Sequence, residues 1–117
     1  MRFEACLELD DAKAAISCAF EGLKPHCVYS SHQGRDYAFE LQSAKALVHA
    51  EPHILWIRVE AEEIAICHGT KMLIVSEIGN CAKNMPNVLW VEANDDPFAA
   101  IMAHNNSEMQ PHDGAGR

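Results

Sequence analysis

The sequence has no long uncharged apolar run and no sign of an export signal. Its apolar stretches, such as Met72 to Val75, fall far short of the roughly 18 to 20 residues that a membrane-spanning helix needs. Its start carries an acid, Glu4, where a signal peptide has a positively charged head, and no apolar segment follows it. We therefore expect neither membrane insertion nor export.

Basic residues are few and scattered. Nine Lys and Arg residues stand against 17 Asp and Glu residues, which gives a formal net charge of −8. Because binding to phosphates needs a stripe of Lys and Arg, direct nucleic-acid binding and binding to anionic membranes are both disfavoured. The charge favours solubility, and it would also attract a basic partner. An acidic inhibitor or nucleic-acid mimic that binds a basic protein is therefore one alternative function.

Paired cysteines are also lacking. The five cysteines are too few and too widely spaced for the framework of a secreted disulfide-rich domain. This spacing favours the reducing cytoplasm, where free cysteines act as small buried apolar residues. The predicted core-filling cysteines are Cys6, Cys18, Cys27, Cys67 and Cys81.

No catalytic motif is present. The serines lack a Gly-x-Ser-x-Gly elbow, and the six glycines do not form a phosphate-binding loop. Paired acids occur at 10–11, 62–63 and 95–96, but each pair lies where a helix is predicted to begin, so helix capping explains them. We expect no catalytic residues, no cofactor and no enzymatic activity.

Seven histidines and five cysteines leave a metal- or haem-binding protein as a second alternative, because imidazole and thiolate bind zinc and copper. The spacing does not favour it: the sequence has no Cys-x-x-Cys, and His49 and His53 are separated by a predicted turn. Ligands would converge only if the fold brought distant residues together. The candidate ligands are His26, Cys27, Cys67, His68 and Cys81.

Apolar spacing predicts the fold. Period-two alternation indicates strands over 2–9, 26–32, 36–42, 54–61 and 88–91, with a further strand at 44–50 after a break near Ser43. Helical spacing indicates helices over 12–23 and 98–104, while 64–78 fits either a helix or a hairpin. The order predicts an α+β two-layer sandwich, an antiparallel sheet with two or three helices on one face.

The predicted domain covers residues 1–104, and the polar, glycine-bearing segment 105–117 is predicted to be a disordered tail. The apolar positions that face inward on this pattern form the expected core. They are Phe3, Leu7, Ile16, Phe20, Phe39, Leu41, Leu55, Ile57, Val59, Leu89 and Val91.

Trp56 is the candidate for a binding surface. It falls on the strand face opposite Leu55 and Ile57, beside Arg58, so it is either packed beneath a helix or part of a partner or ligand surface. The preferred function is a non-enzymatic binding or accessory protein whose surface for a protein or small ligand contains Trp56 and Arg58. A homodimer is compatible with this function.

Three segments carry a family resemblance. A short helix at 17–20 leads through Lys24 to a hairpin, a strand follows at 46–51, and the segment 55–62, LWIRVEAE, runs from a strand into a helix start. Residues 13–76 thereby resemble a family of small bacterial proteins of unknown function, also found as a domain attached to siderophore-interacting flavoproteins.

The resemblance implies an accessory role near iron or siderophore metabolism, and it favours a helix rather than a hairpin after Glu62. The sequence departs from the family at Ala19, where the family usually carries a histidine, and residues 88–104 lie outside its pattern. No catalytic residues follow from the resemblance.

Overall fold

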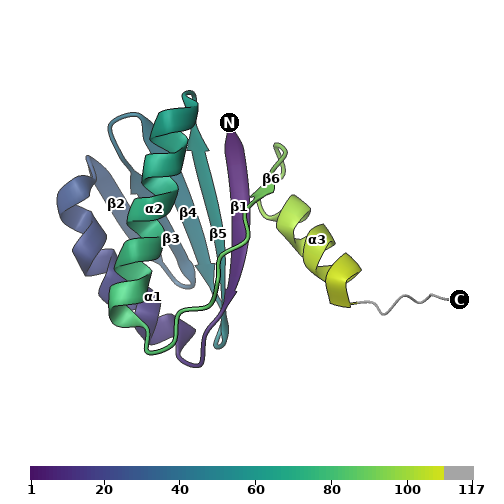
Figure 1. The fold of residues 1–117 in the computed structure, drawn as a ribbon. Helices are drawn as coiled ribbons and strands as arrows, with labels where there is room; N and C mark the ends of the chain where they lie inside the picture. The colour runs from purple at the N-terminus through teal and green to yellow at the C-terminus, as the bar shows by residue number, and fades with distance from the viewer. Residues whose placement is uncertain (110–117) are drawn as a thin grey trace, which may run out of the picture.

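A computed structural model describes residues 1–109 and contains one antiparallel sheet with three helices (Figure 1). The sheet order is β2-β3-β4-β5-β1-β6. The strands are β1 (Arg2–Glu8), β2 (Tyr29–Gln33), β3 (Asp36–Glu40), β4 (Ala44–Ala50), β5 (Ile54–Ala61) and β6 (Val91–Glu92). The helices are α1 (Ala12–Leu23), α2 (Ile64–Cys81) and α3 (Ala99–Met109), with a short 3-10 helix, η1 (Lys24–His26), after α1. The predicted α+β two-layer fold is confirmed.

The main core lies between the sheet and the layer formed by α1 and α2 (Figure 1). Leu7 of β1 and Leu55, Ile57 and Val59 of β5 are buried there, as their alternation predicts. Phe3, Phe20 and Leu41 pack against this core but are only partly buried. Each fully buried Leu or Ile contributes about 1.5 to 3 kcal/mol of transfer free energy, so this layer stabilises the fold.

Residues 64–78 form a helix and not a hairpin. The buried residues of α2 recur three or four positions apart, which places them on one stripe against the sheet and α1. That stripe consists of Cys67, Thr70, Lys71, Ile74 and Ile78. Met72 lies off this stripe and is 72% exposed.

The C-terminal part differs from the prediction in three places. Leu89, expected in the core, is 62% exposed, and regular pairing begins only at Val91, because 88–90 is part of the connection from α2 to β6. Helix α3 continues through Met109 instead of ending at His104. The rest of the predicted tail lies outside the described residues.

None of the described helices is both long and apolar enough to cross a bilayer.

Helix α3 packs beside β1 and β6, away from α1 and α2 (Figure 1). It approaches the sheet face to which Glu4 points, since alternate residues of β1 face opposite sides and Phe3 and Leu7 face the core. Ile101 of α3 is 2% exposed but lies outside the main core cluster. The sheet is therefore covered on its second face near β1.

The paired acids flank the helices, but they do not cap them as predicted. Asp11 and Glu63 occupy the N-cap positions of α1 and α2, yet neither side chain makes a capping hydrogen bond. Their favourable effect is thus limited to the interaction of negative charge with the helix dipole, about 0.3 to 1 kcal/mol each. At α3 the cap comes from another strand, as described below.

Two of the five cysteines are bonded to each other, which corrects the expectation that all five are free. Cys18 of α1 and Cys81 at the end of α2 form a disulfide, with their Cα atoms 5.9 Å apart. The packing of α1 against α2 brings together two residues that are 63 positions apart in the sequence. Cys6, Cys27 and Cys67 are free, and Cys67 is fully buried, as predicted for a core-filling cysteine.

Candidate functional site

The candidate metal ligands do not converge. Cys81 is consumed by the disulfide, Cys67 is buried in the main core, and His68 points from the exposed side of α2. His26 and Cys27 lie in and just after η1. Across residues 1–109, no group of three or more His, Cys, Asp or Glu side chains has a spacing that would hold a metal ion.

Trp56 and Arg58 are not on the surface. Trp56 is 8% exposed and Arg58 is 2% exposed, so the binding surface predicted from them is buried. Of the two interpretations of Trp56, burial is the one that the structure favours. Its indole N–H has no hydrogen-bond acceptor among the described residues.

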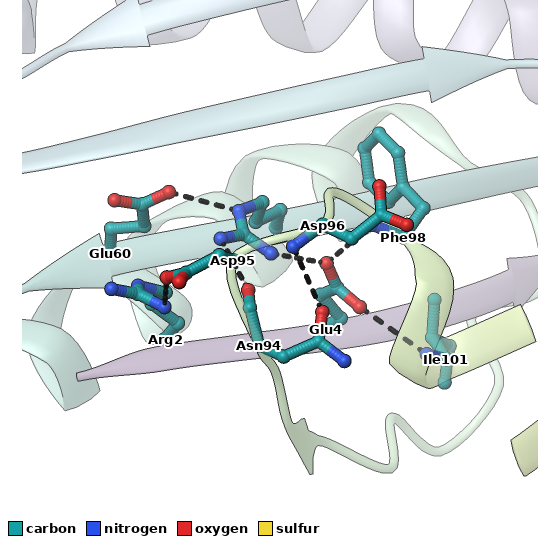
Figure 2. Close-up of polar contacts among 9 residues, drawn as sticks. Arg2, Glu4, Glu60, Asn94, Asp95, Asp96, Phe98 and Ile101 are labelled. Atoms are coloured by element: carbon teal, nitrogen blue, oxygen red, sulfur yellow. Dashed lines mark hydrogen bonds and ion pairs between the residues drawn. The ribbon is translucent and has the colours of Figure 1, made fainter. Parts of the chain in front are cut away.

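Arg58 and Glu4 instead form a buried ion pair, which we name the clamp. Glu4 of this pair holds the start of α3 to the sheet (Figure 2). The residues are paired across β5 and β1, and Arg58 Nη1 donates to Glu4 Oε2 at 2.6 Å. Glu4 Oε2 also accepts the backbone N–H of Phe98 at 2.6 Å, and Oε1 accepts that of Ile101 at 3.2 Å. A carboxylate from β1 therefore caps the first turn of α3, where the helix dipole favours negative charge.

The remaining donors of Arg58 are also used. Nε donates to Glu60 Oε2 at 2.9 Å and Nη2 donates to the carbonyl of Asn94 at 2.8 Å. Burial lowers the pKa of Arg58, but the hydrogen bonds with Glu4 and Glu60 outweigh that effect and raise the pKa above its usual value. Arg2 adds an exposed ion pair with Asp95 at the edge of the clamp (Figure 2).

The clamp is a structural feature and not a place for a ligand. Both carboxylate oxygens of Glu4 and all three nitrogens of Arg58 already have partners within the protein. A ligand would have to displace a charge-assisted hydrogen bond in a region without solvent, which is costly. Phe98, held at the start of α3, has a positive φ of 67°, a conformation that non-glycine residues seldom adopt.

A polar hollow of about 730 Å³ lies at one end of the sheet, near the start of α2. Four glutamates line it, Glu40, Glu60, Glu62 and Glu63, and the amino group of Met1 in the same hollow donates to the carbonyl of Ala61 at 2.6 Å. Acidic side chains in contact with water carry no ligand specificity by themselves, so this hollow is the weaker candidate.

A groove of about 650 Å³ runs between α2 and the connection 86–90. The connection follows α2 along the sheet on its way to β6 (Figure 1). Met72, Val75, Val88 and Trp90 give the groove apolar walls, and the polar groups on its rim are His68, Ser76 and Asn87. We name this feature the α2 groove.

Lys71 supplies a positive charge to the α2 groove. The residue is 7% exposed, and its Nζ lies 3.4 Å from the centre of the Phe3 ring and 5.4 Å from that of Trp90. Both distances are typical of cation–π contacts. Within the described part of the chain, Lys71 forms neither an ion pair nor a hydrogen bond. A nearly buried ammonium without a counter-charge is unusual in a protein with 17 acids.

Sequence reasoning missed Lys71 because a lysine in a helix is usually placed on the solvent side. One signal was available: Lys71 lies four positions after Cys67 and seven before Ile78, which puts it on the apolar stripe of α2. The aromatic contacts had no such signal, because Phe3 and Trp90 are contributed by the two ends of the fold.

These features define a two-layer α+β protein with an internally satisfied clamp on one sheet face and an apolar groove on the other. The groove contains one ammonium, that of Lys71, which has no ion pair among residues 1–109. No protein-family model matches the chain, and no curated protein matches it. Among solved structures, the NMR structure of PA4090 from Pseudomonas aeruginosa is similar, with a TM-score of 0.61 and 10% sequence identity. The match covers 80% of this chain and 98% of that chain, and at this identity it supports the fold alone.

Proposed function

We propose that the protein is a non-enzymatic binding or accessory protein that takes a small ligand in the α2 groove. The observation that supports this is the groove itself, whose volume of about 650 Å³ lies within the range of ligand pockets, about 300 to 1,000 Å³. Its walls are mainly apolar, and its few polar groups are grouped along the rim, which is the usual composition of such pockets.

The test is a screen of small organic molecules by amide chemical shifts of the full-length, ¹⁵N-labelled protein. We expect the ligands that bind to shift the amides of His68, Met72 and Val88 more strongly than those of strand β4, which contributes no residue to the groove. A Ser76→Trp variant, which places an indole in the groove, should abolish these shifts. The matched control is Ser43→Trp in the polar hollow, which should leave them in place.

Two results would contradict the proposal. One is a screen in which every ligand that binds shifts amides outside the α2 groove. The other is retention of the groove shifts in the Ser76→Trp variant. Thermal unfolding of both variants shows whether they are folded, and Ser76 and Ser43 are exposed, so both should tolerate the indole.

A role near iron or siderophore metabolism is part of this proposal, and its support is the sequence resemblance over residues 13–76. It predicts that a strain lacking the gene grows more slowly than its parent when an external chelator limits iron, and equally well when iron is sufficient. Equal growth of both strains under chelation would remove the iron link and leave the ligand-binding proposal in place.

A further inference from the structure

We infer that the ligand of the α2 groove is a monoanion with an apolar body, of the class of aryl or alkyl carboxylic acids, and that Lys71 binds its carboxylate. This inference rests on the proposed function, because it names the chemistry of the ligand for the same groove. Its basis is the ammonium of Lys71, which has no ion pair or hydrogen bond within the described part of the chain and belongs to a residue that lines a largely apolar groove.

Burial of Lys71 has a cost that the protein offsets only in part. An ammonium removed from water needs counter-charge or hydrogen-bond acceptors, and the rings of Phe3 and Trp90 supply only a quadrupole. An exposed cation–π contact is worth about 0.5 to 1 kcal/mol, and one that is desolvated about 2 kcal/mol. The three hydrogens of Nζ have no acceptor in the described residues, so a ligand carboxylate would complete the site.

The charge pattern selects a monoanion. Lys71 is the only cation among the residues that line the α2 groove, apart from the ring of His68 when protonated. A phosphate dianion requires a second fixed cation or a cluster of backbone N–H groups, and it would meet the field of a protein with a net charge of −8. A single carboxylate is matched by one ammonium.

The groove walls select the rest of the ligand. On one wall of the groove, Trp90 is half-buried beside Val88. On the other wall, which is formed by α2, Met72 is 72% exposed. A flat or linear apolar chain in contact with both sides would bury surface at about 25 cal/mol per Å², and methionine adapts to ligands of irregular shape. Ser76 and Asn87 on the rim are uncharged, so they add no further preference for the charge of the ligand.

The experiment compares three probes that share one skeleton and differ in charge: 4-phenylbutyrate, 4-phenyl-1-butanol and 4-phenylbutylamine. Each is titrated into the full-length protein and followed by amide chemical shifts and by tryptophan fluorescence. We expect the carboxylate to bind about tenfold tighter than the alcohol, as for a hydrogen bond to a charged group, and the amine to bind most weakly. The amides of Lys71 and Trp90 should shift with the carboxylate.

Variants assign the preference to Lys71. Lys71→Met keeps a long apolar side chain at a buried position and should make the carboxylate and the alcohol bind equally well. Lys71→Arg keeps the charge and should retain a preference for the carboxylate. The control is Lys45→Met on β4, an exposed lysine outside the groove, which should leave the tenfold preference unchanged.

The outcomes separate this inference from the proposed function. If the alcohol binds in the groove as tightly as the carboxylate, the ligand class is wrong and the groove remains a binding site. If the preference for the carboxylate survives in Lys71→Met, Lys71 is not the anion-binding residue and the inference is likewise overturned. If none of the three probes and no member of the screen shifts the groove amides, both proposals fail.

Discussion

At the scale of single residues, the two most informative side chains are a buried glutamate and a buried lysine, and they differ in how their charges are satisfied. Glu4 is 0% exposed and has three partners, Arg58 and the N–H groups of Phe98 and Ile101. Lys71 is 7% exposed, and its ammonium contacts only aromatic rings among the residues that the structure describes. A satisfied buried charge indicates a structural role, whereas an unsatisfied one indicates a place for a ligand.

Replacement of Arg58 by methionine should destabilise the protein by about 3 to 5 kcal/mol, because it leaves the Glu4 carboxylate buried without its counter-charge. Urea unfolding followed by circular dichroism measures this change. Glu60→Gln removes another partner of Arg58, but the Glu60 side chain is 41% exposed, so that loss should be below about 1 kcal/mol. Equal losses for the two variants would mean that the pair does not behave as a buried clamp.

At the scale of elements, α3 is the part whose docking depends most on distant residues. Its first turn is capped by Glu4 of β1, and its buried side is formed by Ile101. On β1, Cys6 lies on the same sheet face and has a hydrogen bond with Asn105 of α3. Cys6 is therefore a natural reporter of whether α3 is docked.

Ile101→Ala should increase the rate at which Cys6 is alkylated under native conditions by about tenfold or more. Truncation of a buried isoleucine to alanine costs about 2 to 5 kcal/mol of stability, and here that loss favours undocking of α3. Burial raises the pKa of the Cys6 thiol above its usual value, and the hydrogen bond with Asn105 opposes this only in part. At neutral pH, fewer Cys6 thiols are thus ionised than in an unfolded chain, so docked protein reacts slowly, and alkylation accelerates as the pH rises.

Mass spectrometry of iodoacetamide-treated protein gives the rate at each cysteine. Met102→Ala, on the more exposed side of the same helix, is the matched control and should change the Cys6 rate little. Cys67, fully buried in the main core, reports global unfolding. A parallel rise at Cys6 and Cys67 would show that the variant unfolds the whole domain, and the picture of a separately docked helix would then be wrong.

At the scale of the whole molecule, the Cys18–Cys81 disulfide joins the two helices that cover the sheet. It connects residues 63 positions apart, so it closes a loop that includes the second half of α1, η1, four strands and all of α2. In the chain-entropy description, a loop of this length stabilises the folded state by about 4 kcal/mol. The effect comes from restriction of the unfolded chain.

We expect a reducing agent to lower the urea midpoint of the oxidised protein by an amount corresponding to about 2 to 4 kcal/mol. The Cys18→Ser/Cys81→Ser variant should show the low midpoint with or without reductant, while Cys27→Ser should respond to reductant as the parent does. A parent midpoint that is insensitive to reductant would contradict a stabilising role for the disulfide.

Local patterns determined most of the elements. Alternation identified β1 and β5 and assigned Leu7, Leu55 and Ile57 to the core, because a strand with one buried face must place apolar residues at every second position. The separate strands predicted over 26–32 and 36–42 correspond to β2 and β3, which pair with each other. The ambiguous segment 64–78, rich in β-branched residues, could not be assigned in this way, because its helical form depends on packing against the sheet and α1.

Only the tertiary structure decided which residues act together. The order of strands places Arg58 against Glu4, 54 positions away, and the packing of the helices joins Cys18 to Cys81. Likewise, the rings around Lys71 come from β1 and from the connection before β6. The hydrophobic period of a strand or helix is a local property of the sequence, whereas the environment of a buried charge and the cap of α3 depend on contacts between distant segments. The absence of a basic stripe or catalytic motif was therefore visible in the sequence, and the unpaired ammonium in the α2 groove was not.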